Sequence, residues 1–451
     1  MRNQGDLGSY VVDVQLKEVA YAALHNEWDE LELDEKLKRF QALQAADAEE
    51  FFRELNAQDE AEILLALPTR DQRLWIRTLD PDDAADVLQE MEEEQDRHHF
   101  LELLDEKTRN EVTALLAYSE DQAGGLMSPR YIRLRPDMTV DEALAYLRIQ
   151  ALEQVETIYF VYVLDPQQKL LGVLSVRRLL SSRHNQKVSE VMRTNVVTVP
   201  EDADQEILSR LFAEHNLLAI PVVDADKHMK GIVTIDDIVD VVEEEATEDI
   251  QKMGGSEALG ESYLKIDLPT MIQKRAGWLI VLFLGELLTA NAMGFFEDEI
   301  ARAVVLTLFL PLIISSGGNA GSQASTLVVR AMSLGEVRLK DWWRVIEREA
   351  MVGLCIGIIL GIVGFIRVLA WDAAFHTYGP HSFLLGIAVG LTLVGIVLWG
   401  TISGSVLPFV LKRAGFDPAS ASTPFVATIV DVTGVLLYFG VANVILRGTL
   451  L

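Results

Sequence analysis

The sequence predicts a multidomain membrane protein with an all-α superhelical N-terminal domain, a repeated α/β module, a connecting helix and an α-helical transmembrane domain with five spans. The first observation behind this prediction is uneven charge. Residues 1–270 carry 57 acidic and 27 basic side chains, whereas residues 271–451 carry 11 and 12. The second is a pair of internal repeats in the acidic part. The third is a series of five apolar segments in the neutral part, each long enough to cross a bilayer.

The composition of the chain excludes several classes of protein. A strongly acidic field repels nucleic acid and accumulates cations, so no nucleic-acid partner is expected. The single cysteine, Cys355, falls in an apolar segment and cannot build a disulfide framework or a thiolate metal cluster. No nucleophile–base pair or phosphate-binding loop stands out, so we do not expect an enzyme. The N-terminus is polar and lacks the apolar core of a signal peptide, so the acidic part is expected in the cytoplasm.

The N-terminal part, residues 1–123, is predicted to be a small superhelix of stacked helices. A leucine with a helix-capping residue close behind it recurs at Leu55, Leu79 and Leu104, with spacings of 24 and 25 residues. A repeat of this length with helical periodicity is typical of such superhelices. The many carboxylates are either a solvated acidic face or ligands of cations. The candidate cation ligands here are Asp59, Glu94 and Asp96.

Residues 124–243 contain two copies of one pattern of strands and helices. The copies begin at Met127 and Met192, and each has a β-branched run followed by an acidic turn. These residues resemble tandem CBS domains, a regulatory module whose two copies pair into one unit. The two domains would cover residues 124–185 and 186–243. The second turn supplies two more candidate cation ligands, Asp224 and Asp226.

The second CBS copy carries a candidate nucleotide site. In CBS families a glycine, a hydroxyl residue and an aspartate at fixed spacing hold an adenosine nucleotide such as ATP. Gly231, Thr234 and Asp237 match that pattern, whereas the first copy has Arg178 in place of the aspartate. At most one nucleotide site is therefore expected. The alternative is that Thr234 and Asp237 only cap the helix that follows.

A connecting helix is predicted in residues 244–273, between the CBS pair and the membrane. Its pattern is broken at Gly254-Gly255, and a second helical part is expected from about residue 262 into Lys274 and Arg275. Carboxylates crowd its start, at Glu243, Glu244, Glu245, Glu248 and Asp249. They repel one another unless cations screen them. Glu244, Glu248 and Asp249 are therefore candidate regulatory ligands, although a simple linker needs no such chemistry.

The transmembrane domain, residues 274–451, has flanking charges that predict its orientation. Basic residues precede the first apolar segment and recur after the second and the fourth, whereas the first opposite loop holds Glu297, Asp298 and Glu299. The positive-inside rule then places the N-terminus in the cytoplasm and the C-terminus outside the cell (inner) membrane. The predicted spans are residues 277–296, 303–329, 350–371, 383–410 and 424–446.

Few polar residues interrupt these spans. Gly400 and Gly404 in the fourth span are expected to let helices approach closely. Asn319 and Gln323 in the second span are four residues apart and share a helical face. They either hydrogen-bond between helices or line a pore, and the sequence favours neither.

Asp431 is the acidic residue of the fifth span. An aspartate at the bilayer centre costs about 2.5–3.5 kcal/mol on insertion scales. Because no Lys or Arg stands near the middle of any span, Asp431 is either protonated or faces water and cations. Ala427 and Thr423 precede it by four and eight residues, so small side chains share its helical face. Magnesium binds hard oxygen ligands and gives up its water reluctantly, so a site built from Asp431 and exposed carbonyls would suit it. The residues do not rank magnesium against manganese, cobalt or nickel.

Glu286 in the first span is a competing carboxylate. It lies among apolar side chains and could serve as a proton relay or as a structural group. With that residue as relay, the chain would be an ion-coupled secondary transporter of divalent cations such as Mg²⁺, Co²⁺ or Mn²⁺. A third alternative is a membrane sensor that transports no ion. This alternative does not explain why Asp431 lies within a membrane span.

Four local motifs complete the sequence pattern. They are residues 118–127, 244–250, Ser-Gly-Gly-Asn-Ala-Gly-Ser-Gln at 316–323 and Pro-Phe-Val-Ala-Thr-Ile-Val-Asp-Val-Thr-Gly at 424–434. With the order of the modules, they resemble the MgtE family of magnesium transporters over nearly the whole chain.

The resemblance implies a function and an assembly. It implies a homodimer in the lipid membrane, five spans per subunit, and a Mg²⁺ pore on the dimer axis that closes when cytosolic Mg²⁺ is high. The pore aspartate of the family corresponds to Asp431, with Ala427 contributing its carbonyl. Thr423 stands where relatives can carry an asparagine.

Overall fold

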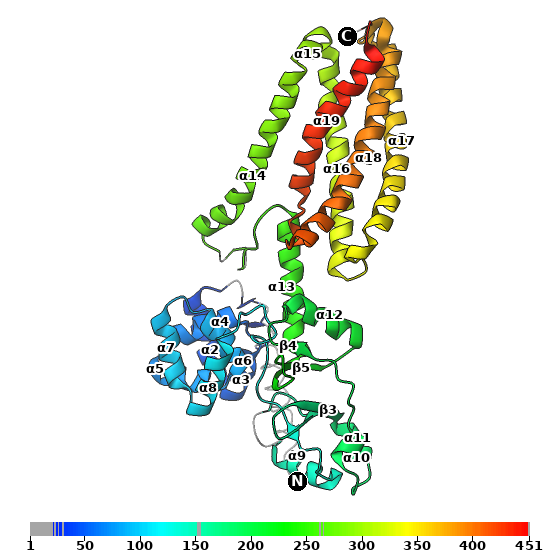
Figure 1. The fold of residues 1–451 in the computed structure, drawn as a ribbon. Helices are drawn as coiled ribbons and strands as arrows, with labels where there is room; N and C mark the ends of the chain where they lie inside the picture. Colours follow the sequence, from blue (N-terminus) through cyan, green and yellow to red (C-terminus); the bar gives the residue numbers. More distant parts are fainter. Residues whose placement is uncertain are drawn as a thin grey trace, which may run out of the picture. The chain divides into compact units, whose positions relative to one another are not determined.

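The computed structural model describes residues 21, 24–25, 27–28, 31–150, 155–260, 263–264 and 266–449. It divides into two compact units, one up to residue 242 and one from residue 243. The first unit holds the helical domain and the α/β repeats, and the second holds the apolar helices (Figure 1).

The N-terminal domain is helical, as predicted. Its helices are α2 (Leu33–Ala42), α3 (Ala45–Arg53), α4 (Ala57–Ala66), α5 (Thr69–Ile76), α6 (Pro81–Gln89), α7 (Glu94–Leu103) and α8 (Glu106–Leu115). The predicted repeat starts α4, α6 and α8, and α6 packs against both of the others. Asn56 and Asp105 cap α4 and α8 through their side chains, whereas α6 begins with Pro81 and has no side-chain cap. Phe40, Phe51 and Phe52 are buried in its core.

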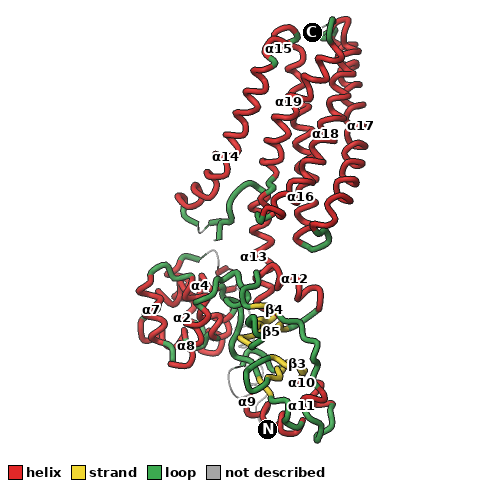
Figure 2. Tube along the Cα trace, viewed as in Figure 1, coloured by secondary structure: helices red, strands yellow, loops and turns green. Residues whose placement is uncertain are grey.

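The α/β repeats form two three-stranded sheets of identical topology. Their strands are the yellow segments in Figure 2. In each, the first strand runs parallel to the second and the second antiparallel to the third, with a register shift at Val163/Leu164 and at Val222/Val223. The first copy contains β1 (Arg133–Leu134), α9 (Val140–Gln150), β2 (Phe160–Leu164), β3 (Leu170–Ser175), α10 (Val176–Ser181) and α11 (Val188–Val191). The second contains β4 (Val199–Pro200), α12 (Gln205–His215), β5 (Ala219–Val223) and β6 (Met229–Thr234). This matching topology confirms the tandem α/β pair.

The connecting helix differs from its predicted range of 244–273. Helix α13 (Ile235–Met253) begins directly after β6 and ends near the glycine pair, where Gly255 takes a positive φ of 81°. The next helix, α14 (Leu268–Phe295), already contains Lys274 and Arg275. The charged turn before the first span therefore continues the membrane helix, because Asp267 caps it and Pro269 suits its first turn.

Among the residues that the structure describes, five helices of the second unit are long and apolar enough to cross a membrane, in agreement with the predicted number. They are α14, α16 (Leu310–Ser333), α17 (Trp342–Phe375), α18 (Ser382–Ala414) and α19 (Thr423–Leu446). Short elements join them, namely α15 (Glu297–Arg302), η2 (Val304–Phe309), η3 (Leu339–Asp341), η4 (Gly379–His381) and η5 (Pro418–Ser420). Helices α16 to α19 lie side by side, and α14 packs mainly on α19 (Figure 1).

Glycines set the spacing of α16 and α18, as their positions in the sequence predicted. A Cβ on Gly404 would lie 2.0 Å from the Gly321 carbonyl oxygen, and one on Gly400 would lie 2.3 Å from that of Gly317. Backbones this close gain van der Waals contact that larger residues would prevent. The packing holds α16 in place, and α16 forms one wall of the site described next.

Candidate functional site

The start of α19 is fixed by hydrogen bonds to two other membrane helices. Ser422 caps α19 by accepting from the backbone N–H of Phe425, and its Oγ also accepts from Trp278 Nε1 in α14 at 3.1 Å. From α16, Ser322 Oγ donates to the Thr423 carbonyl at 3.3 Å and Ser325 Oγ donates to the Ala421 carbonyl at 2.8 Å. The sequence motifs at 316–323 and 424–434 thus meet in space.

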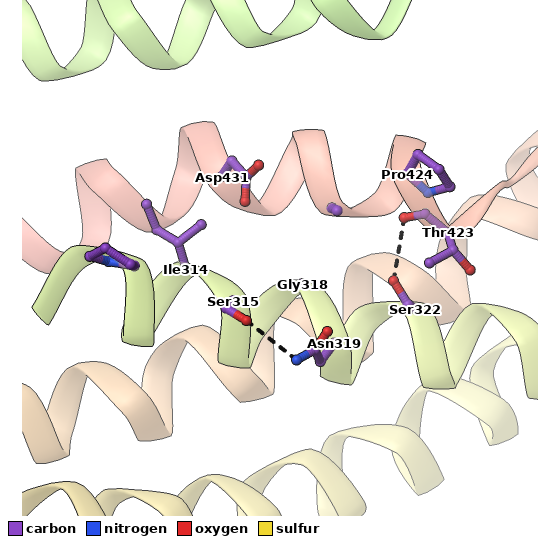
Figure 3. A pocket seen from close by; sticks show the side chains of 10 residues that line it. Ile314, Ser315, Gly318, Asn319, Ser322, Thr423, Pro424 and Asp431 are labelled. Atoms are coloured by element: carbon purple, nitrogen blue, oxygen red, sulfur yellow. Dashed lines mark hydrogen bonds between the residues drawn. The ribbon is translucent and has the colours of Figure 1, made fainter. Parts of the chain in front are cut away.

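A pocket of about 390 Å³ lies between α16 and α19, with Asp431 in its wall (Figure 3). The lining residues are Pro311, Ile314, Ser315, Gly318, Asn319, Ser322, Thr423, Pro424, Ala427 and Asp431. Among these ten described residues Asp431 alone is ionisable. Hydroxyl, amide and carbonyl oxygens make up the other polar lining, and hard cations such as Mg²⁺ are bound by oxygen ligands.

The structure brings together four of the five residues that the sequence offered as pore candidates. Asp431, Ala427, Thr423 and Asn319 all line this pocket. Gln323 instead lines a neighbouring hollow of about 400 Å³ with Ser322, Thr326 and Leu327. Asn319 Nδ2 donates to Ser315 Oγ at 3.4 Å within its own helix, which favours pocket lining over a bond between helices. A Cβ on Gly318 would lie 3.6 Å from Ala427 Cβ, so α16 and α19 are in van der Waals contact beside the pocket.

Glu286 lies beside Asp431, a proximity that the sequence did not reveal. Its carboxyl group is within hydrogen-bonding reach of the Asp431 carboxyl. The cause is the packing of α14 on α19, where a Cβ on Gly285 would lie 2.7 Å from Thr428 Cγ2. Sequence reasoning placed Glu286 and Asp431 in different spans and had no signal for which faces meet.

The C-terminal end of α13 is anchored to the segment that precedes α19. Lys252 Nζ lies 2.6 Å from Glu248 and 2.7 Å from Asp417, the residue that caps η5. Partial burial alone would lower the pKa of Lys252, but its hydrogen bonds to Asp417 and Glu248 raise it, so the residue stays charged. Asp249 accepts from Ser333 Oγ of α16 at 2.9 Å, and burial raises its pKa.

Further along, Gly255 contacts a residue that lines the pocket. A Cβ on Gly255 would lie 3.0 Å from the Trp278 ring and 3.1 Å from Pro424, which lines the pocket. Only glycine readily combines that approach with a positive φ. The connecting segment is therefore in contact with the first turn of α19.

A second acidic region lies where the N-terminal domain meets the CBS pair. Asp82, Asp83 and Asp86 of α6 are electrostatic neighbours of Glu156 and Asp237. Burial raises the pKa of all five carboxyl groups, that of Asp83 to about 6, Glu156 to about 7 and Asp237 to about 8. Asp82 is only 6% exposed, and its Oδ1 atom has no hydrogen-bond partner among the described residues.

Arg130 fixes this domain contact from the CBS side. Its guanidinium donates to Glu111 Oε2 at 3.1 Å, to Asp80 Oδ1 at 3.3 Å and to Thr108 Oγ1 at 2.9 Å. Because the side chain is almost fully buried, removal of one of these partners would leave a buried charge without compensation.

The structure distributes the predicted regulatory residues over several environments. Asp59 is buried and pairs with Lys36 at 2.6 Å, Asp224 pairs with His228 and Lys230, and Glu94 and Asp226 are exposed. Asp96 lies in the first turn of α7, and Glu244 in α13. Among the described residues, no three His, Cys, Asp or Glu side chains converge enough to hold a metal ion by themselves. The α6 carboxylates were missed, although the spacing of Asp82, Asp83 and Asp86 puts them near one face of a helix.

The predicted nucleotide residues make local contacts. Thr234 Oγ1 and its backbone N–H both donate to Asp237 Oδ2, at 3.0 and 3.2 Å, at the start of α13. A Cβ on Gly231 would lie 2.8 Å from the Ser128 carbonyl oxygen, so glycine is required for strand packing there. These contacts agree with the capping alternative and leave nucleotide binding a prediction.

Comparison with known proteins agrees with this architecture. The magnesium transporter MgtE of Thermus thermophilus is 39% identical over 432 residues, which is 93% of this chain and 92% of the relative. The chain belongs to the MgtE family. Family models match the MgtE intracellular N domain at residues 20–121, CBS domains at 123–185 and 188–244, and the MgtE divalent cation transporter domain at 310–441.

Further matches cover parts of this MgtE chain. The crystal structure of the cytosolic domain of the Mg²⁺ channel MgtE in complex with ATP shares 40% identity and covers 50% of the chain and 93% of its own, with a TM-score of 0.47. Inosine-5'-monophosphate dehydrogenase of Aquifex aeolicus is 29% identical over only 27% of the chain and 24% of its own. MgtE is a family of membrane transporters, and the partial match to a dehydrogenase does not make the chain an enzyme.

Proposed function

We propose that this protein moves Mg²⁺ into the cytoplasm through a pore whose ion site contains Asp431. The pocket between α16 and α19 carries this proposal, because it joins one carboxylate to hydroxyl, amide and carbonyl oxygens within membrane helices. Mg²⁺ gives up its water reluctantly, and a roomy site with few direct ligands suits an ion that keeps part of its hydration shell. Asp431, Thr423 and Asn319, with the Ala427 carbonyl, are the proposed ligands.

The pore is proposed to lie on the axis of a homodimer. The pocket is open on the surface of one subunit, so a second copy would enclose it with an equivalent pocket. Two Asp431 carboxylates would then face the same ion. With the positive-inside rule, the N-terminus lies in the cytoplasm and the C-terminus outside the inner membrane.

We infer that cytosolic Mg²⁺ closes this pore through the acidic regions. At high Mg²⁺, cations would offset the repulsion among Asp82, Asp86, Glu156 and Asp237 and among the α13 carboxylates, favouring a compact state. A ligand shifts such an equilibrium only by its differential affinity for the two states. The described carboxylates are scattered and do not form one tight Mg²⁺ site. Each would bind Mg²⁺ weakly, and the response would depend on many of them together. The contacts of Lys252 and Gly255 would then transmit a movement of α13 to α19.

We also propose that the second CBS domain binds an adenosine nucleotide near Thr234 and Asp237. Binding would require Asp237 to exchange its bond to Thr234 for ribose hydroxyls. Calorimetric titration of the full-length protein with ATP tests this, with Thr234→Ala and Arg178→Ala as variants of the two copies. Loss of binding in the first variant alone supports the assignment, and loss in neither overturns it.

Uptake of Mg²⁺ by the purified protein in liposomes, with internal Mg²⁺ varied, tests the main proposal. We expect uptake at low internal Mg²⁺ and progressive inhibition as it rises. Uptake that does not respond to internal Mg²⁺ would overturn the gating, and no cation uptake at all would favour a sensor. The carboxyl pair of Glu286 and Asp431 is the one observation that favours an ion-coupled transporter instead, and dependence of uptake on a proton gradient would decide for it.

A further inference from the structure

The carboxyl groups of Glu286 and Asp431 form a pair inside the membrane-spanning region. Asp431 lies three residues after Thr428, the side chain over which Gly285 packs without a Cβ. Glu286 directly follows Gly285, so the close approach of the two helices delivers its carboxyl to hydrogen-bonding reach of Asp431. A larger residue at position 285 would move the two helices apart.

Such a pair requires either a shared proton or a bound cation. Two ionised carboxylates in an apolar span repel each other strongly, and charge in this environment is paired or faces a water-filled cavity. No Lys or Arg lines the adjoining pocket, whose described lining holds only neutral side chains besides Asp431. In the proposed homodimer each subunit contributes such a pair, and concentrated negative charge attracts a divalent cation more strongly than a monovalent one.

A further oxygen lies on the same face of α14. Thr289 is one turn beyond Glu286, and its buried Oγ1 has no hydrogen-bond partner among the described residues. Residues three apart on a helix are neighbours on its surface. Glu286 and Thr289 therefore add a second group of oxygens to those of α16 and α19.

We propose that Glu286 is a second carboxylate of the ion pathway and favours a divalent over a monovalent cation next to Asp431. This assignment rests on the proposed function, because it requires Asp431 to contact the transported ion. In this proposal Glu286 binds the transported cation, in addition to any role in the packing of α14 on α19.

The test uses the full-length protein in liposomes and compares Glu286→Gln with the wild type. The substitution keeps the size of the side chain and removes its charge. We expect the half-saturating Mg²⁺ concentration to rise about tenfold. Flux of K⁺ relative to Mg²⁺ should increase as well. Glu286→Asp, which keeps the charge, should restore much of both properties, and Glu299→Gln in α15 serves as a matched control outside the site.

The outcomes separate this inference from the proposed function. If Asp431→Asn abolishes uptake while Glu286→Gln keeps the wild-type half-saturation and selectivity, Glu286 is no ligand and only the inference fails. If Asp431→Asn leaves uptake unchanged, the proposed pore itself fails. An equal loss of all fluxes in Glu286→Gln, with unchanged half-saturation, would show a structural role and overturn the assignment. If that variant does not insert, the comparison of Glu286→Asp with the wild type carries the test through its half-saturation.

Discussion

Lys252 Nζ lies 2.7 Å from Asp417 Oδ2, which joins the last turn of α13 to the segment that leads into α19. The lysine side chain is 24% exposed and also pairs with Glu248. Five residues after Asp417, Ser422 caps the helix that carries Asp431. A displacement of α13 is therefore expected to reach the ion site through a short, hydrogen-bonded path.

Substitution of Lys252 should weaken regulation more than transport. We expect Lys252→Gln to raise the internal Mg²⁺ concentration for half-inhibition about fivefold, since one partly exposed ion pair is worth up to about 1 kcal/mol. Uptake at low internal Mg²⁺ should stay close to that of the wild type. Liposome flux at graded internal Mg²⁺ measures both quantities, with Lys340→Gln as the control. Unchanged half-inhibition would exclude this path.

Removal of the pocket carboxylate should abolish transport. We expect Asp431→Ala to lower Mg²⁺ uptake at least about tenfold, because the ion loses its charged ligand in the membrane. Asn443→Ala changes an exposed polar residue of the same helix and should keep normal uptake. Flux is to be compared at equal amounts of inserted protein. Normal uptake in Asp431→Ala would contradict the pore site.

The close packing of α16 on α18 makes Gly404 sensitive to any side chain. We expect Gly404→Ala to destabilise the protein by about 1–3 kcal/mol, because its Cβ would meet the Gly321 carbonyl oxygen. Gly440→Ala is the matched control, since no atom lies within 4 Å of its added Cβ. Thermal unfolding in detergent compares the two variants, and equal melting temperatures would disprove the packing argument.

The buried carboxyl groups between the N-terminal domain and the CBS pair should make the contact pH-dependent. The pKa of Glu156 is raised to about 7 and that of Asp237 to about 8, above their unfolded values near 4. Their protonation therefore stabilises the contact at low pH, and this stability is lost as the pH rises through 7 and 8. Limited proteolysis at pH 6 and pH 8.5 should show faster cleavage at the higher pH, and added Mg²⁺ should slow it.

A double variant controls for this effect. Asp82→Asn with Glu156→Gln removes two of the repelling charges, so the difference between the two pH values should shrink and the protection by Mg²⁺ should weaken. A full pH response in the double variant would place its origin elsewhere.

Gating should also depend on the carboxylates at the start of the connecting segment. The group consists of Glu243, Glu244, Glu245, Glu248 and Asp249. We expect its neutralisation to reduce inhibition by internal Mg²⁺, because the cations that screen this repulsion would no longer be needed. Liposome flux with internal Mg²⁺ varied measures the change. Intact inhibition would remove this group from the proposed mechanism.

Several features could be predicted from local periodicity and composition alone. These are the short capped helices, the repeated α/β pattern, the five apolar spans and Asp431, a carboxylate that is unfavourable in the bilayer and lies among small residues. Helices and strands can be recognised from the spacing of apolar residues that are close in the sequence. A charged residue within an apolar span has few structural roles, so it marks a functional position. The same reasoning placed the start of the connecting helix late, because α13 continues the second CBS domain without a break.

The folded structure shows which distant carboxylates meet. It placed Glu286 beside Asp431, joined Lys252 to Asp417 and gathered Asp82 with Glu156 and Asp237, whereas Asp59 paired with Lys36. The residues of each pair are too far apart in the sequence for helical or strand periodicity to predict their contact. Their proximity depends on the rotation and spacing of packed helices, which glycines such as Gly285 and Gly404 set through contacts with residues far along the chain.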